Sequence, residues 1–123
     1  MTALQLPCYD CPNFVNGTAA EVDRTVAMWQ SYYANFSALG AGELLFDYTI
    51  DEPTAHCTTP GCDSHWAIIR ARSQALHRAS THLRTLVTTE FCQPCVNSTC
   101  VANPGLTNVS SLIDLWVCLY LRQ

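Results

Sequence analysis

Apolar residues recur every three or four positions between residues 18 and 39, the spacing that lines one face of an amphipathic helix. The apolar face consists of Val22, Val26, Trp29, Tyr33 and Phe36. Thr18, with Glu21 three residues later, has the pattern of a capping box. Gly40 and Gly42 follow the last apolar position and predict the end of the helix.

A second helical pattern begins at Asp63 or Ser64, either of which can act as N-cap, and runs to about residue 89. Its apolar arc contains Ile68, Ile69, Ala75, Leu76, Ala79, Leu83, Leu86 and Val87. Its opposite arc contains Arg70, Gln74, His77, Arg78, His82 and Arg84. Such a basic arc is either a solvated face or a surface that binds a partner.

Two residues interrupt this pattern. Arg72 lies in the apolar arc, where an unpaired charge is costly, so it should meet a carboxylate or emerge at the end of the bundle. Trp66 lies on the polar arc, where it either packs under the loop between Cys57 and Cys62 or is exposed as a binding anchor.

A last apolar segment, 107–121, follows Pro104 and Gly105 and is apolar on almost every side of a helical wheel. Residues 42–50 fit either a short helix or a strand, and residues 51–62 have the composition of a loop. We therefore expect an all-α fold. It would be a small disulfide-braced bundle of three to four helices, with room for a short strand pair, and residues 1–123 would form a single secreted helical domain.

The charge pattern limits the classes of partner. All six basic residues are arginine, and they face ten carboxylates, which gives a net charge of -4. A nucleic-acid partner is not expected from this balance. The start, MTALQLP, lacks the pattern of a signal peptide, and the chain has no run of 18 apolar residues. A membrane contact is expected only if the natural chain continues past Gln123.

Cysteine usage indicates an oxidising compartment. The chain has eight cysteines in 123 residues: Cys8, Cys11, Cys57, Cys62, Cys92, Cys95, Cys100 and Cys118. Two C-x-x-C pairs, CYDC and CQPC, lie about 80 residues apart, farther than the spacing usual for one zinc site. Zinc near Cys57 and Cys62, or a redox role for CQPC, are the alternatives to disulfide bonds. We expect eight oxidised cysteines and no metal.

Glycosylation sequons indicate the same compartment. Four of the six asparagines stand in N-x-S/T: Asn16, Asn35, Asn97 and Asn108. Serine and threonine make up 21 of 123 residues, so chance would place about one asparagine in such a motif. A secreted or extracellular protein with glycans at these four positions is therefore expected.

No motif of a hydrolase, metalloprotease or phosphate-binding loop is present, so we expect neither an enzyme nor a cofactor. His77 and His82 are five residues apart, which does not match a metal pair on one helical face.

The order of features in the C-terminal two thirds resembles short-chain four-helix cytokines of the interleukin-7 and interleukin-9 type. These features are CTTPGC, a helix of about 25 residues, the cysteine group with its sequon in FCQPCVNST, and a final apolar helix. The absence of lysine is a departure from that family. The resemblance implies a ligand for a pair of cell-surface cytokine receptors.

We therefore expect a secreted glycoprotein that binds a protein receptor at a cell surface. The alternative is a viral or gamete-surface ectodomain that binds a receptor or assembles with sister subunits. The expected contact residues are those of the helix surface that carries no sequon: Trp66, Arg70, Gln74, His77, Arg78 and Arg84, with His82 beside them.

Overall fold

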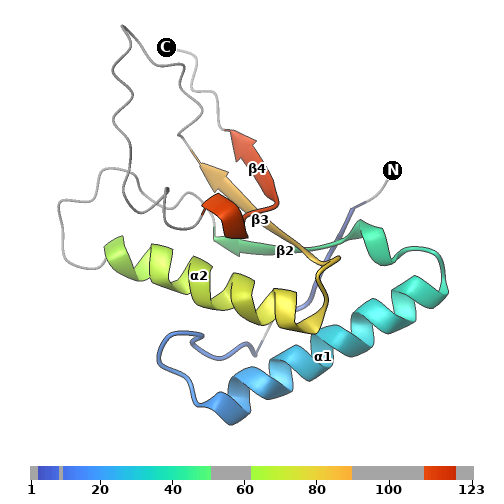
Figure 1. Cartoon of the computed structure of the whole chain (residues 1–123), viewed down its shortest axis with the longest axis horizontal. Helices are drawn as coiled ribbons and strands as arrows, with labels where there is room; N and C mark the ends of the chain where they lie inside the picture. The colour runs from blue at the N-terminus through green and yellow to red at the C-terminus, as the bar shows by residue number, and fades with distance from the viewer. Residues whose placement is uncertain (1–2, 9, 51–61, 90–109, 119–123) are drawn as a thin grey trace, which may run out of the picture.

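The computed structural model describes residues 3–8, 10–50, 62–89 and 110–118 (Figure 1). In this part of the chain, two long helices alternate with short strands. The elements are β1 (Leu4–Gln5), α1 (Ala19–Ala38), a 3-10 turn η1 (Gly42–Leu44), β2 (Leu45–Ile50), α2 (Cys62–Ala79), β3 (Arg84–Thr89), a second 3-10 turn η3 (Ser110–Leu112) and β4 (Leu115–Cys118).

The strands form one parallel sheet in the order β1-β2-β3-β4. Each long helix connects two neighbouring parallel strands, which gives two successive β-α-β units. Alternate residues of β2 are buried, and these are Leu45, Asp47 and Thr49. Leu45 packs with residues of both helices, so α1 and α2 cover the same side of the sheet (Figure 1). The expected all-α bundle is therefore wrong, because the described chain is a mixed α/β fold.

The first helix has the predicted position and ends. The Thr18 hydroxyl accepts a hydrogen bond from the Glu21 backbone, and the Glu21 carboxylate accepts one from the Thr18 backbone at 2.8 Å. The backbone turns out of the helix at Gly40, whose φ of 73° lies in the left-handed region that glycine adopts readily. Val26 and Trp29 are buried, as their place in the apolar seam predicts.

The second predicted helix is too long. α2 ends at Ala79, and the chain continues through a turn into β3. Leu83 and Val87 are fully buried as predicted, but Val87 is buried in a strand. The β-branched residues of RTLVTT favour this extended conformation.

The last predicted helix is also wrong within the described residues. Residues 110–112 form the turn η3, and Leu115–Cys118 forms β4 beside β3. An apolar run on every side also fits a strand of a parallel sheet, because such strands are covered on both faces. The ambiguous segment 42–50 contains both structures, the turn η1 and the strand β2.

Buried side chains form two clusters between the helices and the sheet. The larger one joins Trp29 of α1 to Leu45 of β2 and Leu76 of α2. The second joins Trp66 and Ile69 of α2 to Val87 of β3 and Ile113. Neither described helix has the length and apolar character needed to cross a bilayer.

Candidate functional site

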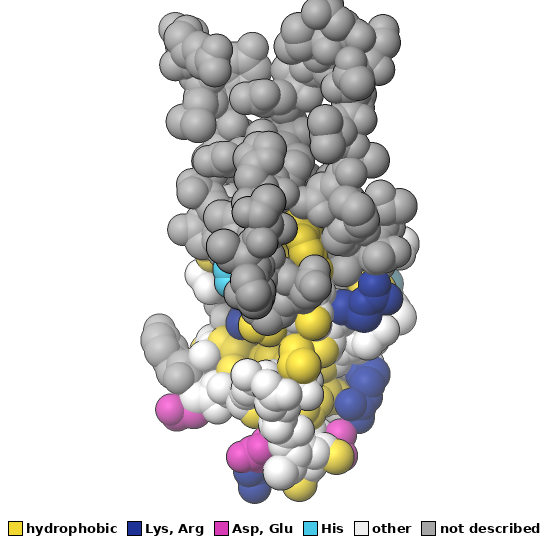
Figure 2. Space-filling view, turned by 90° about the vertical axis from the view of Figure 1, so that its left-hand side faces the viewer, with side chains coloured by type: hydrophobic (Ala, Val, Ile, Leu, Met, Phe, Trp, Pro, Cys, Tyr) yellow, Lys and Arg dark blue, Asp and Glu magenta, His cyan; other side chains and the backbone are white. Residues whose placement is uncertain are grey.

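The segment that leaves β1 contains the disulfide and borders a surface groove. The Leu6 backbone N–H still donates to the Phe46 carbonyl of β2 at 2.8 Å, and the chain turns away at Pro7. Cys8 and Cys11 then form a disulfide. Hydrophobic side chains are gathered on this side of the molecule, with acidic and basic side chains around them (Figure 2). In parallel sheets, the loops that follow the strands are the usual place for functional residues.

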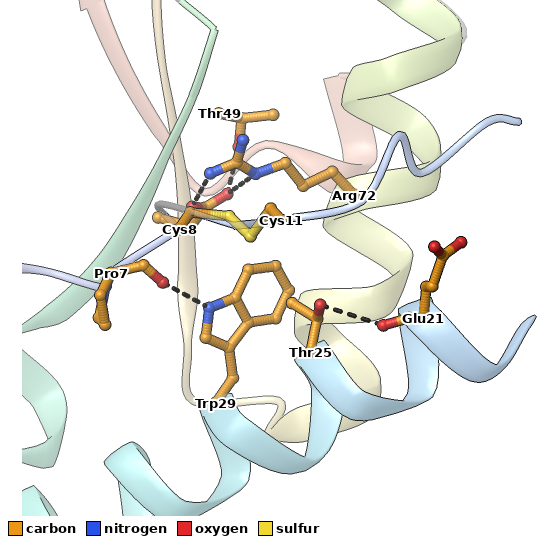
Figure 3. The surroundings of a disulfide bond; sticks show 9 residues. Pro7, Cys8, Cys11, Glu21, Thr25, Trp29, Thr49 and Arg72 are labelled. Carbon is orange, nitrogen blue, oxygen red and sulfur yellow. Dashed lines mark hydrogen bonds and ion pairs between the residues drawn. A yellow bond between two sulfur atoms is a disulfide. The ribbon is translucent and has the colours of Figure 1, made fainter. Parts of the chain in front are cut away.

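Trp29 supports the disulfide from the side of α1. Its indole is fully buried, and its Nε1–H donates to the Pro7 carbonyl at 3.4 Å, which ties the residue before Cys8 to the helix. The ring of Phe14 stacks on the indole with centroids 5.7 Å apart. The disulfide lies between the Trp29 indole and the Arg72 guanidinium (Figure 3).

Arg72 forms a buried ion pair with Asp47. The Asp47 side chain is 0% exposed and that of Arg72 is 15% exposed. The guanidinium donates from Nε at 2.8 Å and from one Nη to the two carboxylate oxygens, and the Thr49 hydroxyl donates at 2.9 Å. The guanidinium carbon also lies 5.6 Å from the centre of the Phe14 ring. The prediction that Arg72 meets a carboxylate is confirmed.

Two hollows border the disulfide on different sides. A groove of about 410 Å³ runs between the Cys11 side and α1. Its lining residues are Pro7, Asp10, Cys11, Pro12, Glu21, Arg24, Thr25, Met28 and Tyr32. A second hollow of about 480 Å³ borders Cys8. Its lining residues are Gln5, Leu6, Pro7, Cys8, Tyr48 and Arg72.

The groove has an apolar wall and charged edges. Met28 and Tyr32 are 36% and 37% exposed, although both are large and apolar. Hydrogen bonds from the Thr18 backbone N–H and hydroxyl hold the pKa of the Glu21 carboxyl below its ordinary value. The groove therefore combines exposed apolar surface with an acid that stays ionised at neutral pH.

The predicted basic arc does not lie on one helix surface, and acidic side chains accompany much of it. Arg78 donates to Asp23 of α1 at 2.7 Å, and the His77 ring lies 3.0 Å from Asp114. Arg84 lies in β3, where its guanidinium is 3.7 Å from Glu43.

Other predicted contact residues differ widely in exposure. His82 also faces Glu43, at 3.3 Å, whereas Arg70 and Gln74 are exposed on α2. Trp66 is only 8% exposed and packs in the second core cluster. Trp66 is therefore a packed residue and not an exposed anchor, while the loop between Cys57 and Cys62, under which it was expected to pack, lies outside the described residues.

Ser73, His77 and Asp114 have the composition of a hydrolytic triad without its geometry. Ser73 is fully buried, and its Oγ has no hydrogen-bond partner among the described residues, while Asp114 accepts from the Thr85 backbone N–H at 2.8 Å. A nucleophile must contact its base and reach the substrate, and Ser73 does neither. The described residues also contain no group of three or more side chains placed to hold a metal ion.

The predicted glycosylation sites and the remaining predicted cysteines lie at other positions of the described chain or outside the described residues. Asn16 and Asn35 are exposed, which a glycan requires. Cys62 and Cys118 lie in α2 and β4, and their oxidation stays a prediction. The remaining predicted positions lie outside the described residues: Cys57, Cys92, Cys95, Cys100, Asn97 and Asn108.

Sequence reasoning did not find the surroundings of the disulfide. It placed Trp29 in the helix seam and expected Arg72 either to meet a carboxylate or to emerge at the end of the bundle, but nothing in the sequence brings Cys8 to both residues. The one available signal was Asp47, a charged residue at an alternate position of the apolar segment LFDYTI. No protein-family model, curated protein or solved structure matches the chain.

Proposed function

We propose that the chain is an extracellular glycoprotein domain that binds a segment of a partner protein in the groove beside the Cys8–Cys11 disulfide. Four sequons and eight cysteines support the compartment. The exposed positions of Asn16 and Asn35 and the bonded state of Cys8 and Cys11 agree with it. The cytokine form of receptor binding is not retained, because it requires a bundle of four helices.

The observation that carries the proposal is the exposure of Met28 and Tyr32 inside a concave surface. Methionine and aromatic residues are enriched at the core of protein interfaces, where a pocket of the partner buries them. The basic arc is less suited to binding, since Asp23 and Glu43 already pair with Arg78 and Arg84.

The charged edges of the groove define the chemistry of the partner. Asp10 and Glu21 outnumber Arg24 among the charged lining residues. A segment with an apolar side chain next to a basic residue complements this surface. Asn35 follows Tyr32 by about one helical turn, so a glycan there would limit the length of partner that fits.

The test compares a groove variant and a control variant of the full glycosylated protein with the wild type in a quantitative cell-surface binding assay. Met28→Ser with Tyr32→Ser should weaken binding at least tenfold, because both residues line the groove. The control is Leu39→Ser, which removes an 81% exposed leucine of the same region that does not line the groove. Equal binding of both variants and the wild type would reject the groove as the binding surface. Circular dichroism confirms that each variant is folded.

A further inference from the structure

We propose that the Cys8–Cys11 disulfide is an exchangeable redox pair that oxidises thiols of a partner protein. The proposal goes beyond binding in the groove, and it rests on the proposed function only in that the groove would hold the thiol-bearing partner. The disulfide itself and its charged surroundings carry the argument.

A bridge between Cys8 and Cys11 closes a very small ring, with a sequence separation of 3. In the chain-entropy description, a ring of about four residues stabilises a fold by about 2 kcal/mol, against about 3 kcal/mol for a ring of about 15 residues. The bridge therefore stabilises the fold less than a disulfide that closes a longer loop.

Both cysteines are reachable from solvent. Each is partly exposed, and they border different hollows, Cys11 the groove and Cys8 the hollow that contains Arg72. The Trp29 indole, bonded to the Pro7 carbonyl, supports the bridge from below (Figure 3). A thiol that approaches through the groove meets Cys11 first.

The charges around the two sulfurs are unequal. On the Cys8 side, the Arg72 cation of α2 is paired with the Asp47 carboxylate of β2, so this pair has no net charge, and Tyr48 also lines this hollow. Within the described residues, Nη1 of Arg72 has no hydrogen-bond acceptor and can donate to a thiolate. A neighbouring cation favours the thiolate form of cysteine.

On the Cys11 side, the charged lining residues are Asp10, and Glu21 and Arg24 of α1. Acidic groups are in excess there, which disfavours a thiolate at Cys11 relative to Cys8. The sulfur that leaves most readily in thiol–disulfide exchange is the one whose thiolate is more stable. Cys8 is therefore the leaving group.

The exchange proceeds in two steps. A thiolate of the partner attacks the Cys11 sulfur, which forms a mixed disulfide and releases Cys8 as a thiolate beside Arg72. A second thiolate of the partner then attacks the partner sulfur that is bonded to Cys11. This forms a disulfide within the partner and releases the Cys11 thiolate, which takes up a proton. The partner loses two electrons and gains one disulfide, and the Cys8–Cys11 pair becomes a dithiol.

The first test equilibrates the full glycosylated protein with glutathione buffers of increasing reducing strength. Thiols are then alkylated, and the tryptic fragment of residues 1–24, which contains Cys8 and Cys11, is analysed by mass spectrometry. We expect this pair to become reduced while the circular dichroism spectrum stays native. A structural disulfide of a secreted protein would instead resist reduction by glutathione. A pair that stays oxidised until the domain unfolds would overturn the proposal.

The second test measures which sulfur is the more reactive thiolate. In Cys11→Ser the free Cys8 should react with the uncharged probe 4,4′-dithiodipyridine at pH 6 about tenfold faster than the free Cys11 of Cys8→Ser. Adding Asp47→Asn and Arg72→Gln to Cys11→Ser removes the cation without leaving a buried unpaired carboxylate.

This added pair of substitutions should slow the Cys8 reaction at pH 6 but not at pH 10, where both thiols are ionised and a thiolate of higher pKa is at least as nucleophilic. A loss of structure alone would not give this dependence on pH. Equal reactivity of the two thiols, or a Cys8 rate independent of Arg72, would contradict the assignment. Neither test uses the partner, so a failure of groove binding leaves both results interpretable.

Discussion

Replacement of Arg72 by methionine should destabilise the domain more than removal of an exposed charge such as that of Arg78. Methionine keeps the unbranched stem but removes the guanidinium, which leaves the fully buried Asp47 carboxylate with the Thr49 hydroxyl as its one remaining donor among the described side chains. Removing one partner of a buried ion pair costs about 3–5 kcal/mol, because the other charge stays buried without compensation. We expect a loss of this size from Arg72→Met.

Urea unfolding followed by circular dichroism measures this loss. The matched control is Arg78→Met, which breaks the exposed Arg78–Asp23 pair. Exposed pairs contribute about 0–1 kcal/mol, so the control should unfold at nearly the wild-type urea concentration. Adding Asp47→Asn to Arg72→Met should recover a large part of the loss, since no charge then stays buried. A loss below about 1 kcal/mol for Arg72→Met, or no recovery in the double variant, would refute the buried-pair reasoning.

The remaining predictions concern the N-terminus of α1 and the arginines of the predicted basic arc. Thr18→Ala should destabilise the protein by about 1 kcal/mol in thermal unfolding at pH 7, because it removes the N-cap of α1. The pKa of Glu21 is lowered from its ordinary 4.5, so its contribution is present above that pH and is lost as the pH falls through the folded-state pKa; Thr18→Ala should weaken this acid dependence. Arg78→Glu with Arg84→Glu should change stability by less than about 1 kcal/mol per site and leave partner binding in the cell-surface assay at the wild-type level. A loss of binding in that variant would show that the partner contacts the basic arc and would contradict this prediction.

Local signals in the sequence were sufficient for α1. Its capping box, its apolar seam and Gly40 act within a few residues of each other, so no distant contact is needed to recognise them. The apolar arc of α2 was also recognised, since Ile69 and Leu76 are buried. The expected N-cap residues Asp63 and Ser64 instead lie inside this helix, which begins at Cys62.

The parallel sheet could not be read in the same way. Leu83, Leu86 and Val87 extend the helical arc of α2 as well as they fit a strand, and the β-branched content of TLVTT was the signal that distinguished the two. LWVC is apolar throughout, a pattern that a buried helix and a buried strand share.

The site depends on sheet pairing and therefore was only half predictable. Arg72 in an apolar arc had either to meet a carboxylate or to emerge at the end of the bundle, and the structure shows the first. Asp47 could be chosen only once β2 lay beside α2, and Cys8 reaches this ion pair only because β1 pairs with β2. These contacts join residues that are far apart in the sequence. The hydrophobic periodicity of a segment gives no information about such contacts.

The most direct test of this account is a peptide map, without reduction, of the protein expressed through a secretory pathway. Trypsin cleavage after Arg24 should release a fragment of residues 1–24 that contains Cys8, Cys11 and Asn16. The account predicts that this fragment is linked to no other, lacks the two hydrogen atoms of a dithiol, and carries a glycan at Asn16. A fragment joined through Cys8 or Cys11 to another cysteine, or one with free thiols and an unmodified Asn16, would contradict both the site and its compartment.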